Sequence, residues 1–281
     1  FVKKENFRDK ISNSIEYIEN LKKYFFVFDV KLCISNSTSL ISPILASNEL
    51  NIPVISWVHG ILSSYSIPVE YDPELRYLME KFLISLSDKV LCCSNWTKSY
   101  YLKEKSDNKI ETLYNWTQIP EERKRKESNV FICLNSFEEH KGILTLLKAV
   151  KIVARKNRKF ILELYGNGNL EITQKMKKYI KENNLEKNVK IYKKVKKTEE
   201  IYHNSFCLIQ PSFVESFGMT IIEAMAHSKP VIASKSGGPE EIIINNETGY
   251  LIDRNDEKAM AKKMLFLLEN KAEAKKWEKM D

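Results

Sequence analysis

Two glutamates, Glu215 and Glu223, lie eight positions apart where the sequence changes from a loop to a helix. The apolar run 206–209 predicts a buried strand before them, and the run 219–227 predicts a helix. The first turn of such a helix carries free N–H groups and partial positive charge, and Gly218 lets an anion approach the backbone. Carboxylates beside that anion can accept hydrogen bonds from paired hydroxyls. The pattern fits a nucleotide sugar, although glutamates at this spacing also occur by chance on solvated helices.

Three further stretches follow this segment in a fixed order. After 215–226 come Lys-Pro-Val-Ile-Ala-Ser at 229–234, Gly-Gly-Pro-Glu-Glu-Ile-Ile at 237–243 and Gly-Tyr-Leu-Ile at 249–252. The ordered set closely resembles the group 1 (family 4) retaining glycosyltransferases. The resemblance implies an α/β fold of the GT-B type, in which two Rossmann-like domains face each other across a cleft. It covers the second half of the chain well and the first half more loosely.

The resemblance also implies roles for individual residues. Glu215 is expected to contact the donor sugar, and Glu223 is expected to bind the ribose hydroxyls. His59 ends an apolar strand-like run and matches a cleft residue near the transferred sugar, so it is grouped with Glu215 as catalytic. A lone histidine is more often structural, and that alternative stays open from the sequence.

A second group of residues is expected to bind the donor. It combines a lysine before a glycine, the loop that enters the helix, the ribose-binding glutamate and three glycines in cleft-facing turns. These residues are Lys141, Ser216, Phe217, Gly218, Met219, Glu223, Gly166, Gly237 and Gly238.

Some positions depart from the family pattern. The family usually has Gly-Arg after the first strand of its second domain, where this chain has Asn135 and Ser136. Replacing a bidentate cation at a diphosphate is not conservative. Ser228 stands where a glycine is common, and Glu241 is taken as the glutamate that follows the glycine pair.

The predicted function follows from the resemblance. The chain is expected to move a sugar from a nucleotide-diphosphate donor to a glycan or lipid-linked acceptor, with retention of configuration. No metal and no other cofactor is expected, because no Asp-x-Asp occurs at a cleft position. Two alternatives remain: an inactive glycosyltransferase-like partner subunit, which Asn135 and Ser136 motivate, and a GT-B sugar-nucleotide epimerase. The donor sugar, base and acceptor are not specified.

Composition limits the class of protein and its partners. With 281 residues, 43% hydrophobic and 29% charged, the chain is globular. Its net charge of +8 favours anionic partners, and peripheral contact with a membrane is left open. No nucleic-acid partner is expected, since the basic run at 123–126 is flanked by acids. Five scattered cysteines and no apolar run that could span a bilayer suggest a cytoplasmic protein.

Strand-like and helical runs alternate along the chain, which is typical of parallel α/β sheets. We expect a partial first domain at 1–117, a linker at 118–128 and a donor-binding domain at 129–281. The first residue is Phe1, and no strand with a glycine loop opens the sequence. We therefore expect a missing N-terminal piece and weak activity for the chain alone.

The expected elements of the first domain are an amphipathic helix at 1–24 with Ile11, Ile15, Ile18 and Leu21 on one face, strands at 28–35, 53–59, 88–93 and 110–114, and helices at 38–50, 73–86 and 95–103. Those of the second are strands at 130–134, 160–165, 189–192, 206–209 and 230–233, and helices at 143–156, 170–183, 198–203, 219–227 and 256–270.

Overall fold

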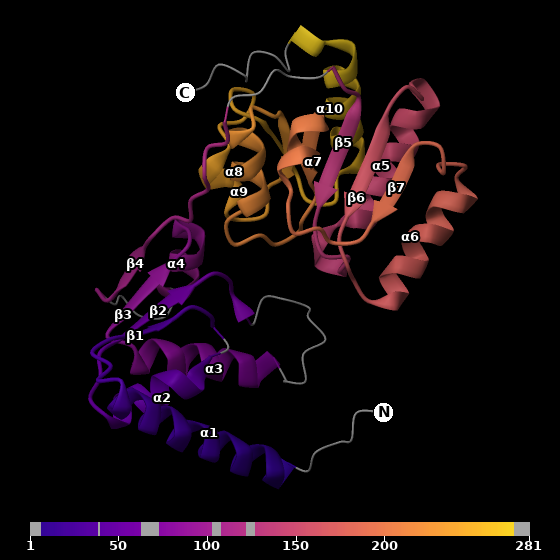
Figure 1. The fold of residues 1–281 in the computed structure, drawn as a ribbon. Coiled ribbons are helices and arrows are strands. Elements are labelled where there is room, and N and C mark those ends of the chain that lie inside the picture. The colour runs from indigo at the N-terminus through magenta and orange to yellow at the C-terminus, as the bar shows by residue number, and fades with distance from the viewer. Residues whose placement is uncertain (1–6, 39, 63–72, 103–107, 122–126, 273–281) are drawn as a thin grey trace. The chain divides into compact units, whose positions relative to one another are not determined.

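The computed structural model describes residues 7–38, 40–62, 73–102, 108–121 and 127–272. The chain divides into two compact units, Phe1–Tyr114 and Asn115–Asp281. Each unit contains one parallel sheet with helices packed on it (Figure 1). The α/β class predicted from the alternating pattern is therefore confirmed. The predicted linker at 118–128 lies partly outside the described residues.

The first unit has a four-stranded parallel sheet in the order β1-β2-β3-β4. Its strands are β1 (Cys33–Ser35), β2 (Val54–Val58), β3 (Lys89–Cys92) and β4 (Ile110–Thr112), and its helices are α1 (Phe7–Val27), α2 (Ile41–Glu49), α3 (Pro73–Leu86) and α4 (Asn95–Leu102). The alternation of buried and half-buried residues along β2 places Val54 and Val58 in the core with Ile44 of α2.

The start of the first unit differs from the prediction. The apolar residues before position 28 belong to helix α1, which ends at Val27. The chain then turns at Asp29, which has φ of 48°. The N–H of Val30 bonds the carbonyl of Phe25 at 2.9 Å, so the strand expected at 28–35 is reduced to Cys33–Ser35. Helix α1 packs against α2, yet Ile15 on its predicted apolar face is 57% exposed.

The second unit has a six-stranded parallel sheet in the order β10-β9-β8-β5-β6-β7. Its strands are β5 (Val130–Leu134), β6 (Ile161–Tyr165), β7 (Val189–Tyr192), β8 (Cys207–Gln210), β9 (Val231–Ser234) and β10 (Tyr250–Ile252). Its α-helices are α5 (Ile143–Lys156), α6 (Leu170–Glu182), α7 (Glu199–Asn204), α8 (Met219–Ala226), α9 (Pro239–Ile242) and α10 (Glu257–Glu269).

Helices cover both faces of this sheet. On β5, Phe131 and Cys133 belong to the core cluster that includes α5 and α10, whereas Ile132 belongs to the cluster that includes α7 and α8. Burial on both faces explains why β8 and β9 are mostly apolar and buried at every position, without the alternation of a half-exposed strand. Among the described residues, no helix is both long and apolar enough to cross a membrane.

The strand order of the second unit reverses between β5 and β8. From β5 the chain proceeds to β6 and β7 on one side, and it then returns to β8, β9 and β10 on the other. In parallel α/β sheets, the carboxyl ends of the strands at such a reversal form a crevice where ligands bind. We therefore expect a ligand-binding site in the segments that follow β5 and β8.

Several short elements of this unit were not predicted. Helix α9 and strand β10 are too short for a periodic pattern to reveal, and a single 3-10 turn at Glu139–Lys141 precedes α5. Strand β8 also runs one residue further than predicted, because the polar Gln210 is part of it. That residue lies at the crevice end of the strand.

Candidate active site

The loop before helix α8 brings the chain to the helix N-terminus through a glycine. Gly218 has φ of 115°, a conformation that side chains strongly disfavour, and its carbonyl accepts the N–H of Ile221 at 2.9 Å. Ser216 and Phe217 are buried, whereas Met219 is 38% exposed at the first helical position. The first N–H groups of α8 have no acceptor inside the helix, so this end is suited to an anion.

Glu215 and Lys141 meet across the strand reversal. Lys141 comes from the turn after β5, Glu215 comes from the loop after β8, and Nζ lies 2.9 Å from Oε2. Their side chains are only 16% and 17% exposed, so water screens the pair weakly. Gly142 follows with φ of 66°, and a Cβ there would overlap the carbonyl oxygen of Pro211. The glycine thus allows the lysine turn to pack against the end of β8.

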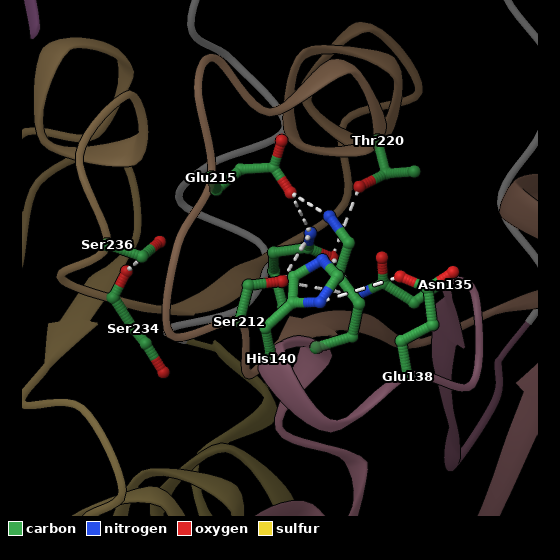
Figure 2. Close-up of polar contacts among 10 residues, drawn as sticks. Asn135, Glu138, His140, Ser212, Glu215, Thr220, Ser234 and Ser236 are labelled. Carbon is green, nitrogen blue, oxygen red and sulfur yellow. Dashed lines mark hydrogen bonds and ion pairs between the residues drawn. The ribbon is translucent and has the colours of Figure 1, made fainter. Parts of the chain in front are cut away.

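A polar cluster surrounds Glu215 at the ends of β5 and β8, and Figure 2 shows its carboxylate facing this cluster. Gln210 Nε2 donates to Glu215 Oε2 at 3.1 Å and to Ser212 Oγ at 3.2 Å. Gln210 Oε1 accepts from Asn135 Nδ2 and from Thr220 Oγ1, both at 3.3 Å. Sequence reasoning missed Gln210, because its only signal was a polar residue directly after an apolar run.

The glycine loop after β9 supports the backbone of Glu215. The N–H of Glu215 bonds the carbonyl of Ser236 at 3.0 Å, and the N–H of Gly238 bonds the carbonyl of Glu215 at 2.8 Å. A Cβ at Gly238 would overlap the backbone of Phe217, and Gly237 has φ of 122°. Both glycines therefore allow this loop to lie directly against the Glu215 segment.

The carboxylate of Glu240 orders the glycine loop. Glu240 Oε2 accepts the N–H groups of Ser236 and Gly237, each at 2.9 Å. The sequence pattern assigns Glu241 as the family glutamate after the glycine pair, and that assignment stays a prediction. The tight turn into α9 brings Glu240 back onto the loop, and Glu241 is exposed.

Gly166 performs a similar packing role after β6. A Cβ at this position would overlap the carbonyl oxygen of Asn135, and the N–H of Asn135 bonds the carbonyl of Tyr165 at 3.1 Å. The loop after β6 therefore lies against the segment after β5, which contains Asn135 and the half-buried Ser136. The backbone of Gly166 therefore lies close to the polar cluster, next to Asn135.

Glu223 lies one turn into α8 and has a different partner. The hydroxyl of Tyr202, a fully buried residue of α7, donates to Glu223 Oε2 at 2.7 Å. The ring of His227 stacks on Tyr202 at 5.0 Å between centroids. Burial, reinforced by the Glu223 charge, raises the pKa of Tyr202 well above its usual range. Tyr202 therefore remains a donor that orients one oxygen of a half-buried carboxylate.

His140 occupies the turn beside Lys141 and is 6% exposed. Burial lowers the pKa of His140, and the charge of Lys141 acts in the same direction. Its carbonyl accepts the N–H of Phe213 at 2.8 Å, which ties the turn after β5 to the loop after β8. Figure 2 shows His140 within the cluster, where Nδ1 lies 3.5 Å from Glu138 Oε2.

His59, the predicted catalytic histidine of the first unit, directly follows strand β2. His59 is exposed, its Nε2 lies 2.6 Å from Asn36 Oδ1, and its ring lies 4.9 Å from that of Trp57. Asn36 directly follows β1, so the pair lies at the carboxyl ends of two neighbouring strands. Its catalytic role stays a prediction.

The second unit thus brings together the predicted donor-binding residues other than Glu223 around the ends of β5, β6, β8 and β9. A cation, a carboxylate and a helix N-terminus lie next to each other there. In the described part of the chain, no three His, Cys, Asp or Glu side chains form a group suited to a metal ion. The metal independence of the site stays a prediction.

Comparison with known proteins identifies the family of the chain. A sequence model of the family described as "Glycosyl transferases group 1" matches residues 115–280. An uncharacterized glycosyltransferase of Methanocaldococcus jannaschii is 30% identical over 228 residues, which make up 80% of this chain and 61% of that protein. The chain therefore spans about six tenths of that relative's length.

Two solved structures share the fold. Anabaena HepE in complex with UDP-glucose has a TM-score of 0.82 and 17% identity, covering 94% of this chain and 74% of its own. Sucrose-phosphate synthase from Thermosynechococcus elongatus has a TM-score of 0.81 and 21% identity, covering 98% and 73%. At these identities the likeness shows the fold, which is the GT-B fold predicted from the sequence.

Proposed function

We propose that this chain, which belongs to the group 1 glycosyltransferase family, transfers a sugar from a nucleotide-diphosphate donor to a glycan or lipid-linked acceptor with retention of configuration. The observation that carries the proposal is the position of Glu215. Its carboxylate is held by Lys141 at 2.9 Å and by Gln210 at 3.1 Å, directly before the N-terminus of α8. Groups suited to a phosphate and a sugar are therefore neighbours.

In this proposal the diphosphate is bound by Lys141 and by the backbone of 216–219. Transfer breaks the bond between the anomeric carbon and the diphosphate, so negative charge develops on the leaving group. A lysine and a helix N-terminus that are already in place stabilise that charge without reorganisation. Glu215 then contacts the hydroxyls of the transferred sugar, on the loop above the phosphates.

The ribose is assigned to Glu223. Tyr202 holds Oε2 of Glu223, and among the described residues no hydrogen bond reaches Oε1. A half-buried carboxylate with one oriented oxygen is suited to accept bonds from paired hydroxyls. Because Glu223 is committed to Tyr202 and the ribose, retention is proposed from family membership and not from a pair of catalytic carboxylates. His59 is proposed as a catalytic residue near the transferred sugar, and no metal or other cofactor is included.

The nucleotide-sugar class of donor is supported by the UDP-glucose complex of HepE, a protein of the same fold. A panel of UDP-, GDP- and ADP-sugars, with nucleotide release and sugar product both measured, tests the proposal. Nucleotide release that requires an acceptor and yields a glycoside supports it. Donor binding without turnover favours the inactive partner subunit. Epimerised sugar without an acceptor favours the epimerase, and no binding of any nucleotide overturns the proposal.

A further inference from the structure

We propose that Gln210 is a positioning residue for Glu215, and that it keeps the carboxylate aimed at the sugar when Lys141 turns to the diphosphate. The inference rests on the proposed function, because it assigns Lys141 to the phosphates and Glu215 to the sugar. Gln210 would touch neither substrate. It would act through the single hydrogen bond of 3.1 Å from Nε2 to Glu215 Oε2.

The side-chain amide of Gln210 makes its full set of hydrogen bonds. An amide side chain has two donor and two acceptor positions, and here all four are used. Nε2 donates to Glu215 and Ser212, and Oε1 accepts from Asn135 and Thr220. Because an ionised carboxylate only accepts, the Glu215 contact fixes which end of the amide faces it. The side chain therefore has one orientation.

Gln210 lies in the interior of the fold, at the end of a buried strand. Every residue of β8 is buried, and Gln210 is 2% exposed at its carboxyl end. A buried amide destabilises a protein unless its hydrogen bonds are made, so an apolar residue would fit a strand interior better. All its partners lie in the polar cluster, which relates the amide to the site.

Glu215 has little conformational freedom apart from its side chain. Its backbone is fixed by bonds to Ser236 and Gly238, so only the side-chain torsions remain variable. In the described part of the chain, Lys141 and Gln210 are the two side chains that donate to Oε2. A diphosphate competes with Glu215 for Lys141, because both are anions. Gln210 is then the donor that continues to orient the carboxylate.

The test compares two variants that each lose a buried amide of similar exposure. Gln210→Met removes the donor to Glu215 with little change in volume. Asn188→Leu removes the side-chain amide of Asn188, the residue directly before β7. That amide donates to the backbone carbonyls of Arg158 and Phe160. Both changes should lower the unfolding temperature. Only Gln210→Met should weaken binding and transfer of the sugar, because of the two amides only that of Gln210 contacts Glu215.

The readouts are the Kd for UDP, GDP and ADP, the Kd for the corresponding nucleotide sugars, and kcat for the 281-residue chain. For Gln210→Met we expect the Kd of the unmodified nucleotide to change by less than about twofold, and that of the nucleotide sugar to rise about tenfold. We expect kcat to fall about ten- to hundredfold, the factor expected for losing one hydrogen bond to a charged group. Gln210→Glu keeps the shape but places a second carboxylate beside Glu215, so its loss should be larger.

The outcomes separate this inference from the proposed function. If the parent chain binds nucleotide sugars and Gln210→Met binds and turns them over like the parent, the inference is wrong and the function stands. Equal effects of Gln210→Met and Asn188→Leu on kcat and on sugar binding would reduce Gln210 to a structural role. If Gln210→Met does not fold, Gln210→Leu, which also removes the donor to Glu215, is compared with Asn188→Leu and should show the same losses. A parent chain that binds no nucleotide overturns both.

Discussion

Lys141 Nζ lies 2.9 Å from Glu215 Oε2, so the cation proposed for the phosphates and the carboxylate proposed for the sugar are paired with each other. The two residues are 74 positions apart in the sequence and come from either side of the strand reversal. A phosphate that uses Lys141 must compete with Glu215. The pair therefore links donor binding to the position of the carboxylate.

Glu215→Gln should abolish sugar transfer and, unexpectedly for a site residue, tighten the binding of the unmodified nucleotide. The substitution releases Lys141 and removes one negative charge beside the phosphate position. Two charges about 4 Å apart interact by several kcal/mol at partly buried positions before screening, so a three- to tenfold gain is a modest estimate. Titration calorimetry with UDP and GDP measures it.

The matched control for this prediction is Glu139→Gln. Glu139 is exposed in the same turn as Lys141, and its substitution removes the same charge without opening the ion pair. Its nucleotide affinity should stay close to that of the parent. Normal turnover by Glu215→Gln would remove Glu215 from the catalytic residues, and weaker nucleotide binding would show that Lys141 does not serve the phosphates.

Tyr202→Phe should weaken nucleotide binding through Glu223. The substitution removes the 2.7 Å hydrogen bond that orients Glu223 Oε2, while the buried ring remains. We expect the Kd of UDP or GDP to rise about three- to tenfold, less than for Glu223→Ala, because a bond to a charged group contributes about 1.5–3 kcal/mol and water replaces part of it. Calorimetry with the unmodified nucleotide measures both variants.

Tyr165→Phe is the control for Tyr202→Phe. Tyr165 also donates to a glutamate at 2.7 Å, but its partner is Glu163 on β6. Loss of that bond should leave the Kd for nucleotide near the parent value. If the two tyrosine variants behave alike, or if Glu223→Ala leaves the affinity unchanged, the ribose assignment of Glu223 is wrong.

The sequence was sufficient to predict the regular elements of the second unit. The expected bounds of β5, α5 and β7 are the observed ones, because each is an apolar or amphipathic run between clear polar boundaries. Short elements such as α9 and β10 carry too few residues for periodicity to detect. Contacts with neighbouring elements stabilise them, and a local sequence pattern carries no information about those contacts.

The side-chain pairing of the site could not be predicted in the same way. The motif located Glu215 and Lys141, but their contact depends on the strand order around β5 and β8. Gln210 illustrates the limit, because one partner precedes it by 75 positions and another follows it by five. Only the folded sheet brings these three segments together.

Ser228→Gly should stabilise the chain. Ser228 has φ of 55°, and it follows α8 in a helix-ending turn where its N–H bonds the carbonyl of Met225 at 2.8 Å. The N–H of Lys229 bonds the carbonyl of Ala224 at 2.9 Å, which completes a Schellman motif. A non-glycine residue there is disfavoured by about 1 kcal/mol, partly offset by the greater unfolded-state entropy of glycine.

We therefore expect Ser228→Gly to raise the free energy of unfolding by about 0.5–1 kcal/mol, seen as a rise of about 1–4 °C in the unfolding temperature. Ser228→Val should lower it, since a β-branched residue fits positive φ least well. Denaturant melts of the three proteins decide the order. Equal stability of the glycine and valine variants would contradict the backbone explanation.

Ser136→Arg should tighten donor binding if the phosphate subsite is intact. Ser136 is half-buried in the segment after β5, and the family usually has an arginine at this position. A hydrogen bond to a charged group contributes about 1.5–3 kcal/mol, so a gain of about tenfold or more for UDP or GDP is expected. Titrations at low and moderate ionic strength measure the gain and its erosion by salt.

The control is Ser136→Gln, which has a long polar side chain without the charge. It should give little gain, because the added affinity comes from the guanidinium on the diphosphate. Combining Ser136→Arg with Glu215→Gln should give a gain smaller than the sum of the two, since both changes add positive charge at the same diphosphate and neighbouring sites couple. Weaker binding by Ser136→Arg would mean that the side chain enters a subsite built differently from the family pattern. In that case the neutral side chains of Asn135 and Gln210, and not the absence of the family arginine, define this end of the site. The inactive partner subunit then becomes the better explanation of what the chain does.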